Sequence, residues 1–355
     1  MNRNYEATMK TPLVSVVITL FNGGRYSRLA LESVLRQDYD NLEIILIDNN
    51  ATQETKNAIN PLIKSFPNKI KYLYEGEQGV CSARNLGILS AKGEYIALLD
   101  DDDIMYPTRI TAQVNYLFLN PNASIVSCWH DVIDEVGNII TRIDAPSYLF
   151  WTKLLLKKTE RYKKHPFVFA HPSTMMFKKE TAIKIGLFDK IFNPVGIDDF
   201  DFCFRMYELG PIVMAPIIGL QYRTFDGSWG LEKWSTAGRR ALVFWERTSF
   251  LFDKIKIHQF YDRPPATHRE INIIRSQWCR ELGTFLMRFP DKRLQAKYLI
   301  KRGLKANPWR LKSWTVYFYS LLPINFFRKK FNICKDEMFP SDCALPNDFD
   351  RVWFC

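Results

Sequence analysis

Short apolar runs alternate with amphipathic segments between residues 11 and 103. Apolar, β-branched runs of this length are typical of strands that are buried on both faces of a parallel sheet. The segments between them carry apolar residues at helical spacing, and Thr52 is a candidate N-cap. The expected strands are 13–19, 42–47, 70–74 and 95–99, and the expected helices are 25–37, 52–66 and 82–91.

This alternation predicts an α/β fold with a doubly wound, mostly parallel sheet. Ligands of such sheets bind beyond the carboxyl ends of the strands. We therefore look for chemistry at Thr19–Asn22, Asp48–Asn50 and Asp100–Asp103, where three of the expected strands end.

The pattern becomes mixed after residue 108. Ala123–Cys128 and Ser173–Phe177 are expected as strands, and Asp199–Leu209 as a helix closed by Gly210. From Trp234 onward the chain reads as mainly helical, basic and aromatic. We expect an N-terminal tail (1–10), an α/β domain (11–230) and a helical, basic, aromatic-rich accessory domain (231–355).

Composition agrees with a globular protein of two unequal domains, since 47% of the 355 residues are hydrophobic and 25% are charged. No apolar run reaches the roughly 18 residues that a membrane-spanning helix needs. Residues 1–10 are polar and lack the apolar stretch of a secretory signal. The seven cysteines are odd in number and lack zinc-site spacing, which favours reduced thiols in a cytoplasmic protein.

The net charge of +11 is concentrated near the C-terminus. Between Asp291 and Lys330 there are eleven Lys or Arg residues and one acid, interleaved with Trp, Tyr and Phe. Cations beside aromatic residues suit peripheral contact with the anionic, cytoplasmic face of a membrane. The alternative is a helical bundle with a solvated basic face. Nucleic acid binding is not expected.

Four consecutive aspartates, Asp100–Asp103, directly follow an apolar strand. Like charges this close oppose folding unless something neutralises them. A divalent cation prefers oxygen ligands, and diphosphate oxygens would complete its shell. The alternative is a solvated acidic turn or an incidental Ca²⁺ loop.

Several ordered motifs resemble those of the family 2 glycosyltransferases, which have the GT-A fold and are mostly inverting. The resemblance runs from Leu13 to about Ser228. Its motifs are VSVVITLFN (14–22), LEIILIDNN (42–50), GVCSARNLG (79–87), GEYIALLDDDDIMYP (93–107), HPSTMMFKKE (171–180), GLFD (186–189) and IDDFDFCFRMYELG (197–210).

The resemblance implies transfer of a sugar, with inversion, from a nucleoside-diphosphate sugar to a hydroxyl of a glycan or lipid-linked acceptor. A UDP-sugar is the first expectation for the donor, and Mn²⁺ or Mg²⁺ is the expected cofactor. Polysaccharide or glycoconjugate biosynthesis is the implied setting.

By the same resemblance, Thr19 and Asn22 line the nucleoside pocket, and Asp48 and Asn49 lie against the base. Asn49 stands where the family often has Asp, which weakens the case for uracil; alternatively, both residues simply end the strand as turn residues. Arg84 lies beside the nucleotide near a helix start, which suits an anion; alternatively, it is an ordinary exposed arginine.

The aspartate cluster and a later loop complete the expected donor site. Asp102 is the first choice for a direct metal ligand, and Asp100 and Asp101 hold the ribose or support the metal. Asp103 is expected to support these residues without binding the metal directly and to cap the segment that follows. In the loop 222–228, Arg223 is expected to contact the diphosphate, and Phe225 replaces a histidine that many relatives use as a ligand. Either Asp226 substitutes for that histidine or the metal keeps more water. The alternative is a plain connecting loop.

Asp198 and Asp199 match the acid pair of the family. An acceptor hydroxyl needs a base within hydrogen-bond reach, and Asp199 is the expected base, with Asp198 orienting the acceptor or the base. The alternative is a helix N-cap pair. Asp201 and Arg205, one turn apart, are expected to form a structural ion pair, and His171 is expected to be structural.

Two other functions stay open. A catalytically inactive protein of the same fold would only bind a nucleotide sugar or a glycan, in line with the departures at Asn49 and Phe225. A nucleotidyltransferase would need a glycine-rich, basic loop after the first strand, and FNGGR (21–25) is a poor match to one.

Overall fold

The computed structural model describes residues 11–145, 163–193, 198–224, 268–287, 293–309 and 311–321. These residues belong to two compact units, one within 11–224 and one within 268–321, and each is described by itself. The expected tail 1–10 and the expected domain boundary near residue 230 lie outside the described residues.

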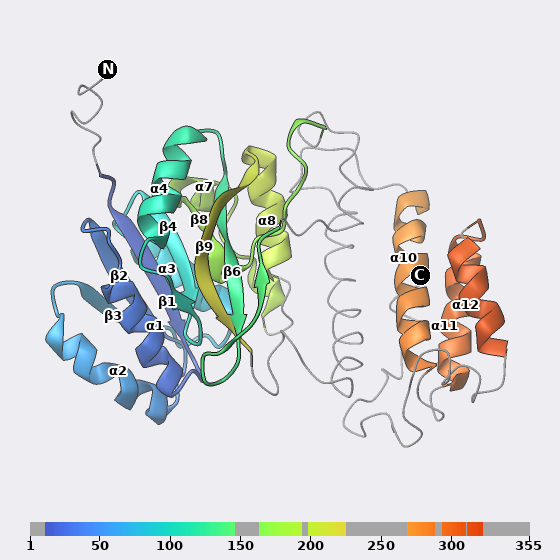
Figure 1. Ribbon diagram of the computed structural model, residues 1–355, viewed down its shortest axis with the longest axis horizontal. Coiled ribbons are helices and arrows are strands. Elements are labelled where there is room, and N and C mark those ends of the chain that lie inside the picture. Colours follow the sequence, from blue (N-terminus) through green and yellow to red (C-terminus); the bar gives the residue numbers. More distant parts are fainter. Residues whose placement is uncertain are drawn as a thin grey trace. The chain divides into compact units, whose positions relative to one another are not determined.

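The first unit is built on one nine-stranded sheet (Figure 1). Its N-terminal half is parallel, in the order β3-β2-β1-β4, as the apolar runs predicted. Register places Thr19 of β1 beside Asp100 at the end of β4. The bounds are β1 Val14–Leu20, β2 Leu42–Asp48, β3 Ile70–Tyr74 and β4 Tyr95–Asp100.

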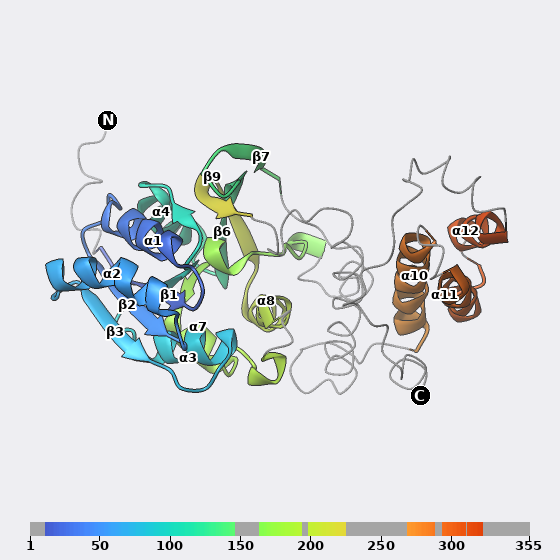
Figure 2. The ribbon, with the colours of Figure 1, turned by 90° about the horizontal axis from the view of Figure 1, so that it is seen from below.

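Helices cover both faces of this parallel half, as expected for a doubly wound fold (Figure 2). On one face lie α1 (Arg25–Leu35) and α2 (Gln53–Ser65), and on the other lies α3 (Val80–Ser90). Thr52 caps α2 by accepting a hydrogen bond from the backbone N–H of Thr55, which confirms the predicted N-cap.

The C-terminal half of the sheet is mixed. β6 runs parallel to β9, whereas β8 is antiparallel to β4 and β6, β5 to β9, and β7 to β6. The elements are β5 Ile104–Met105, α4 Arg109–Leu119, β6 Ile125–Ile133, β7 Ile139–Ile143, η1 Pro172–Thr174, β8 Met176–Lys178, α7 Lys179–Lys184, η2 Lys190–Phe192, α8 Asp198–Leu209 and β9 Ile212–Arg223.

One predicted strand begins later than expected. Ser173 and Thr174 belong to the 3₁₀ turn η1, and β8 begins at Met176. Pro172 at the first position of this turn has no N–H to donate to a sheet, which favours a turn there. The helix expected at 199–209 is confirmed as α8 and begins one residue earlier, at Asp198.

The second unit is helical in its described residues, as the sequence predicted. It consists of α10 (His268–Leu286), α11 (Arg293–Ala306) and α12 (Leu311–Leu321). A Cβ at Gly303 would lie 2.9 Å from Cβ of Cys279, so this glycine allows α10 and α11 to approach closely. None of the helices in the described ranges combines the length and the apolar character needed to cross a membrane.

Candidate functional site

The four consecutive aspartates reach different surroundings because the chain turns sharply where β4 ends. Asp100, the last residue of β4, is one-third exposed and donates its backbone N–H to Oγ of Ser173 at 2.9 Å. Asp103 is buried, and Oδ1 of its carboxylate accepts the backbone N–H of Arg223 at 2.9 Å. Adjacent acids therefore have different roles, which their sequence spacing did not reveal.

Asp101 shapes the loop that follows β1. Its Oδ2 accepts hydrogen bonds from the backbone N–H groups of Phe21 and Gly23, at 3.0 and 3.1 Å, and from the hydroxyl of Ser27 at 3.1 Å. A nucleoside-binding loop at this edge of the sheet would thus be positioned by Asp101. The ribose contact expected from sequence would have to use the other carboxylate oxygen.

Asp102 has the carboxylate that is best placed to meet a cation. Within the described part of the chain, no side chain or backbone group of another residue donates a hydrogen bond to it. Burial, together with repulsion from Asp100 and Asp101, raises the pKa of Asp102 to about 7. Asp103 is buried close by, and burial together with Asp102 and Asp100 raises its pKa. Ionisation of all these carboxyl groups at once is therefore unfavourable unless a cation neutralises them.

The donor set fits a small divalent ion that also binds phosphate. Across the described ranges, no three His, Cys, Asp or Glu side chains converge as a ready-made cation site. Mg²⁺ and similar ions, however, commonly take one or two carboxylates and complete their shell with substrate phosphates and water. Asp102 with Asp100 meets that requirement.

Arg223, which was expected at the diphosphate, is buried, and its guanidinium donates hydrogen bonds to backbone carbonyl groups. Its Nε donates to the backbone carbonyl of Asp102 at 3.0 Å, and one Nη donates to the carbonyls of Asp134 and Glu135 at 2.9 and 3.1 Å. Its guanidinium lies 4.5 Å from the ring centroid of Tyr26. Arg223 therefore holds the turn that carries Asp102.

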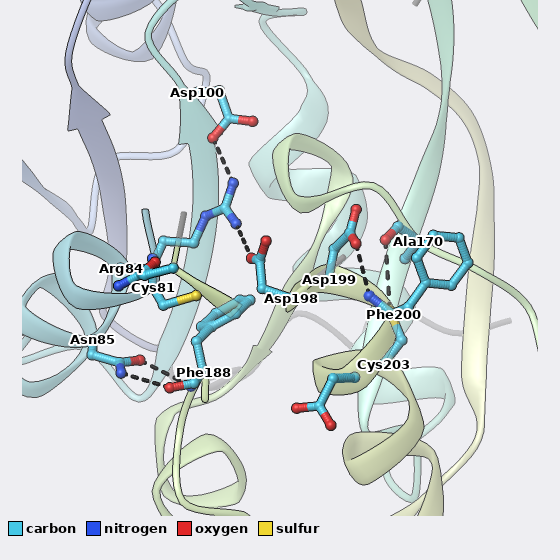
Figure 3. Close-up of polar contacts among 12 residues, drawn as sticks. Cys81, Arg84, Asn85, Asp100, Ala170, Phe188, Asp198, Asp199, Phe200 and Cys203 are labelled. Atoms are coloured by element: carbon cyan, nitrogen blue, oxygen red, sulfur yellow. Dashed lines mark hydrogen bonds and ion pairs between the residues drawn. The ribbon is translucent and has the colours of Figure 1, made fainter. Parts of the chain in front are cut away.

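Arg84 joins the end of β4 to the acid pair (Figure 3). One Nη donates to Oδ2 of Asp198 at 2.6 Å, and the other donates to Oδ1 of Asp100 at 2.9 Å. Burial disfavours the charge of Arg84, but the two carboxylates outweigh it and raise its pKa. Arg84 is 5% exposed, so the alternative of an ordinary exposed arginine is wrong.

Asp199 follows Asp198 in the first turn of α8. Its Oδ1 accepts the backbone N–H of Phe200 at 2.8 Å. Burial and the neighbouring Asp198 raise the pKa of Asp199 to about 7, against the opposing effect of Arg84. A carboxyl group that titrates near neutral pH can accept a proton from a substrate under physiological conditions. Farther along α8, the expected Asp201–Arg205 ion pair is present.

The side chains at the end of β2 are occupied by the protein itself. Asp48 accepts hydrogen bonds from Tyr72, the Ala51 backbone and Lys56, which together lower its pKa although burial acts to raise it. The Asn49 amide donates to the carbonyls of Glu75 and Glu77 at 3.0 and 2.8 Å. Its oxygen accepts the N–H of Gly79 at 2.8 Å. Pairing of Asn49 with a base edge would break these bonds.

Two predicted residues lie at the end of β1 and beyond it. Thr19 is half-buried, beside Asp100 in the sheet register. Asn22 is exposed in the loop that Asp101 holds. Phe225 and Asp226 of the expected closing loop lie outside the described residues.

A cluster of buried and half-buried rings lies close to both acidic groups, and the sequence did not indicate it. The ring centroids of His130, His171 and Tyr222 are 5.4 to 5.9 Å apart. Burial lowers the pKa of both histidines to about 4, so they are neutral. Burial, and then Asp103, Asp102, Asp100 and Asp199, raise the pKa of Tyr222. His171 belonged to a recognised motif, whereas no local pattern marks His130 or Tyr222.

Comparison with known proteins agrees with the motifs. A family model described as glycosyl transferase family 2 matches residues 15–186. An uncharacterized glycosyltransferase of Rickettsia felis is 31% identical over 245 residues, which are 68% of this chain and 38% of the relative. One of Rickettsia prowazekii is 32% identical over 212 residues, 57% of this chain and 61% of the relative. The chain thus spans less than two thirds of these relatives.

Solved structures share the fold at low sequence identity. A mannosyltransferase from Pyrobaculum calidifontis, in complex with GDP-Man and Mn²⁺, has a TM-score of 0.53 at 18% identity and covers 91% of this chain and 80% of its own. S. aureus TarS 1–349 has a TM-score of 0.51 at 16% identity and covers 90% and 92%. The expected GT-A-type fold is confirmed by these likenesses, which concern the fold alone.

Proposed function

Since residues 15–186 are a family 2 glycosyltransferase domain, we propose that this chain transfers a sugar from a nucleoside-diphosphate sugar to an acceptor hydroxyl. One observation carries the proposal. Through Arg84, the acidic end of β4 and the acid pair of α8 lie within one ion-pair network at the carboxyl edge of the sheet. A group that holds a diphosphate and a group that accepts a proton are thereby brought together.

The aspartates at the end of β4 hold the donor in this proposal. Asp102, with Asp100, binds Mn²⁺ or Mg²⁺, and such an ion stabilises the charge of a departing nucleoside diphosphate. Support comes from the Asp102 carboxylate, to which no other residue in the described part of the chain donates a hydrogen bond, and from its repulsion by Asp100 and Asp101. The solved mannosyltransferase of the same fold contains Mn²⁺ and GDP-Man.

Asp199 is the proposed general base. It takes the proton of the acceptor hydroxyl as that oxygen forms a bond to the anomeric carbon, and the bond from this carbon to the diphosphate breaks. A single displacement of this kind inverts the anomeric configuration. Support comes from the place of Asp199 in the first turn of α8 and from its pKa of about 7.

The nucleoside pocket is proposed between the ends of β1 and β2. Thr19 and Asn22 lie on its β1 side, and Asp48 and Asn49 shape its β2 side through the loop 75–79. Because the Asn49 amide is engaged with backbone groups, the identity of the base depends on other contacts. A UDP-sugar remains our first candidate donor, and the acceptor is a glycan or a lipid-linked glycan.

The helical unit supports a further part of the proposal, contact with an anionic membrane surface. On α12 the apolar residues Leu311, Trp314, Phe318 and Leu321 recur every three or four positions and are 39 to 81% exposed. Ser313 and Ser320, by contrast, are buried. A helix that turns its large apolar residues outward and its serines inward has its apolar face available to an external partner.

Exposed cations near this helix favour lipid as that partner. Lys301 and Lys305 lie one turn apart on α11, and both are exposed. Cations with aromatic side chains match the headgroup region of an anionic bilayer. Parts of the predicted basic segment, residues 291–292, 310 and 322–330, lie outside the described residues.

A donor panel tests the proposed function. Purified protein is incubated with UDP- and GDP-sugars, with Mn²⁺, with Mg²⁺ or with EDTA, and release of nucleoside diphosphate is measured. We expect metal-dependent hydrolysis of at least one donor. Binding of a nucleotide sugar with neither hydrolysis nor transfer to any added acceptor glycan would instead favour the inactive binding protein.

A further inference from the structure

Polar side chains of helix α3 contact the residues 188–193 and the acid pair. They are the side chains of Ser82, Arg84 and Asn85. Asn85 forms two hydrogen bonds with the backbone of Phe188: its Nδ2 donates to the carbonyl at 2.8 Å, and its Oδ1 accepts the N–H at 2.9 Å. These two residues are 103 positions apart in sequence. The Asn85 amide therefore holds the start of the segment 188–193 against α3.

A second contact holds the same segment five residues later. Oδ1 of Asn193 accepts the backbone N–H of Cys81 at 3.0 Å, and its Nδ2 donates to Oγ of Ser82 at 3.0 Å. Asn193 thus satisfies an N–H in the first turn of α3 that a ligand would otherwise need to meet. Gly79 makes this approach possible, because a Cβ there would lie 2.2 Å from Cγ of Asn193.

Arg84 makes the third contact and continues it to the sheet. It lies one turn along α3 from Val80, and its two ion pairs lead to Asp198 on α8 and to Asp100 at the end of β4. Asp198 and Arg84 are both buried, with side chains 7 and 6% exposed. A charge-assisted pair in such surroundings has a defined geometry, and losing one partner leaves the other charge buried.

From these contacts we infer that Arg84 is a positioning residue, which sets the place of the Asp198–Asp199 pair relative to the donor-binding end of β4. Its sequence motif suggested a contact with the nucleotide instead, and the inference replaces that role. It rests on the proposed function, because it assigns Asp199 as the base whose position matters. Small displacements of a base from its substrate cost about a hundredfold in rate.

The shape of the arginine side chain explains why this residue type is needed. A guanidinium presents separate N–H groups on two edges, so it can bind two carboxylates from different elements at once. Lysine keeps the charge but concentrates it at one point. Arg84→Lys should therefore keep the fold and the charge while loosening the link between Asp100 and Asp198.

The experiment compares Arg84→Lys and Arg84→Met with the wild type by two measurements. Calorimetry measures binding of UDP and of GDP in the presence of Mn²⁺, and hydrogen exchange followed by mass spectrometry measures the opening of α8. We expect nucleotide affinity within about threefold of wild type, and exchange in peptides from 198–209 about tenfold faster. With a donor that supports hydrolysis, kcat falls about a hundredfold while KM changes by less than about threefold.

Two controls make the result specific. Arg28→Met removes an exposed arginine that pairs only along its own helix, with Glu32, and should alter neither measurement. Asp198→Asn breaks the same contact from the other side. If Arg84→Met speeds exchange throughout the α/β unit, Asp198→Asn decides: faster exchange confined to α8 supports the inference, and unchanged exchange there overturns it.

Other outcomes contradict the inference directly. Nucleotide affinity that falls more than tenfold with exchange of α8 unchanged makes Arg84 a ligand of the diphosphate. Unaltered exchange and unaltered kcat in both Arg84 variants leave it no positioning role. Wild-type protein that binds neither UDP nor GDP contradicts the proposed function, whereas the exchange comparison still tests the link between α3 and α8.

Discussion

The carboxylate of Asp101 accepts a hydrogen bond from the backbone N–H of Gly23 at 3.1 Å, between residues 78 positions apart. The bond joins the turn after β4 to the loop after β1, so both sides of the proposed donor site share one hydrogen-bonded link. Gly23 lies close because it lacks a side chain: a Cβ there would be 2.6 Å from Oδ2 of Asp101 and 2.4 Å from Oγ of Ser27.

Replacing this glycine should therefore damage the donor site. In Gly23→Ala, the added methyl group pushes the Asp101 carboxylate away, and the loop loses its acceptor. We expect affinity for UDP or GDP with Mn²⁺ to fall at least about tenfold, with about 1–3 kcal/mol lost from the free energy of unfolding. Ser65→Ala, at an exposed residue at the end of α2, is the control. Equal affinities in the two variants would contradict the prediction.

Asp199→Asn should separate catalysis from binding. The amide keeps the shape of the side chain but cannot take a proton, so transfer should fall by about 10²- to 10⁴-fold while nucleotide affinity is retained. Asp40→Asn, at an exposed aspartate before β2, serves as the control. Turnover near the wild-type value in Asp199→Asn would remove this residue from the role of base.

The pH dependence of kcat/KM follows from the same group. Asp199 works only when it is deprotonated, and burial raises its pKa to about 7. Activity should therefore rise as the pH increases toward 7 and level off above it. A rate that is constant from pH 5 to 8 would show that no such base limits the reaction.

Asp102→Asn should weaken metal-dependent binding selectively. The substitution removes one negative oxygen from the proposed ligand set without changing side-chain size. We expect binding of nucleoside diphosphate in the presence of Mn²⁺ to weaken at least about tenfold, whereas binding in EDTA changes little. Calorimetry with and without the metal checks this, and an equal loss under both conditions would argue for a role in binding the nucleotide itself.

Buried His130 and half-buried His171 should make folding sensitive to acid. The unfolded chain protonates these rings below about pH 6.5, whereas burial lowers the folded pKa of His130 and His171 to about 4. Stability that is present above pH 6.5 is thus lost as the pH falls toward 4, by up to about 3 kcal/mol for each ring.

Urea unfolding of His171→Gln between pH 7 and 5 tests this sensitivity. The variant has no ring to protonate, so its stability should depend on pH less steeply than that of the wild type, by about 2 kcal/mol over this range. His165→Gln replaces an exposed histidine and should keep the wild-type slope. Parallel curves for all three proteins would refute the prediction.

Vesicle sedimentation tests the membrane proposal. The wild type should bind vesicles that contain phosphatidylglycerol, bind pure phosphatidylcholine poorly, and dissociate as salt is raised. Trp314→Ser with Phe318→Ser removes apolar contacts from α12 and should reduce binding at least about tenfold. Leu119→Ser replaces an exposed apolar residue of the α/β unit and should have no effect on vesicle binding. Equal sedimentation of both variants would rule out the α12 face as the contact.

Local patterns were sufficient to predict the parallel half of the fold. The runs at β1, β2 and β4 are mostly apolar on both faces. Apolar residues at helical spacing in the segments between the strands predict α1 and α3, which pack on the sheet. Such signals are local, because side-chain direction repeats every two residues in a strand and every three to four in a helix. The positions of β5 to β9 in the sheet do not follow their order in the sequence. They depend on pairings between distant segments, which no local period encodes.

The sequence alone determined which residue types gather at the carboxyl edge of the sheet, since strand ends in a parallel sheet share one edge. It did not determine their partners. Asp100 and Asp101 are adjacent, yet one meets Arg84 and the other the loop at Gly23. Only the tertiary structure decided this, because burial and hydrogen bonding depend on which distant segments fold against each carboxylate. For that reason Arg84 could be recognised from its motif, whereas its contact with Asp198, 114 positions away, could not.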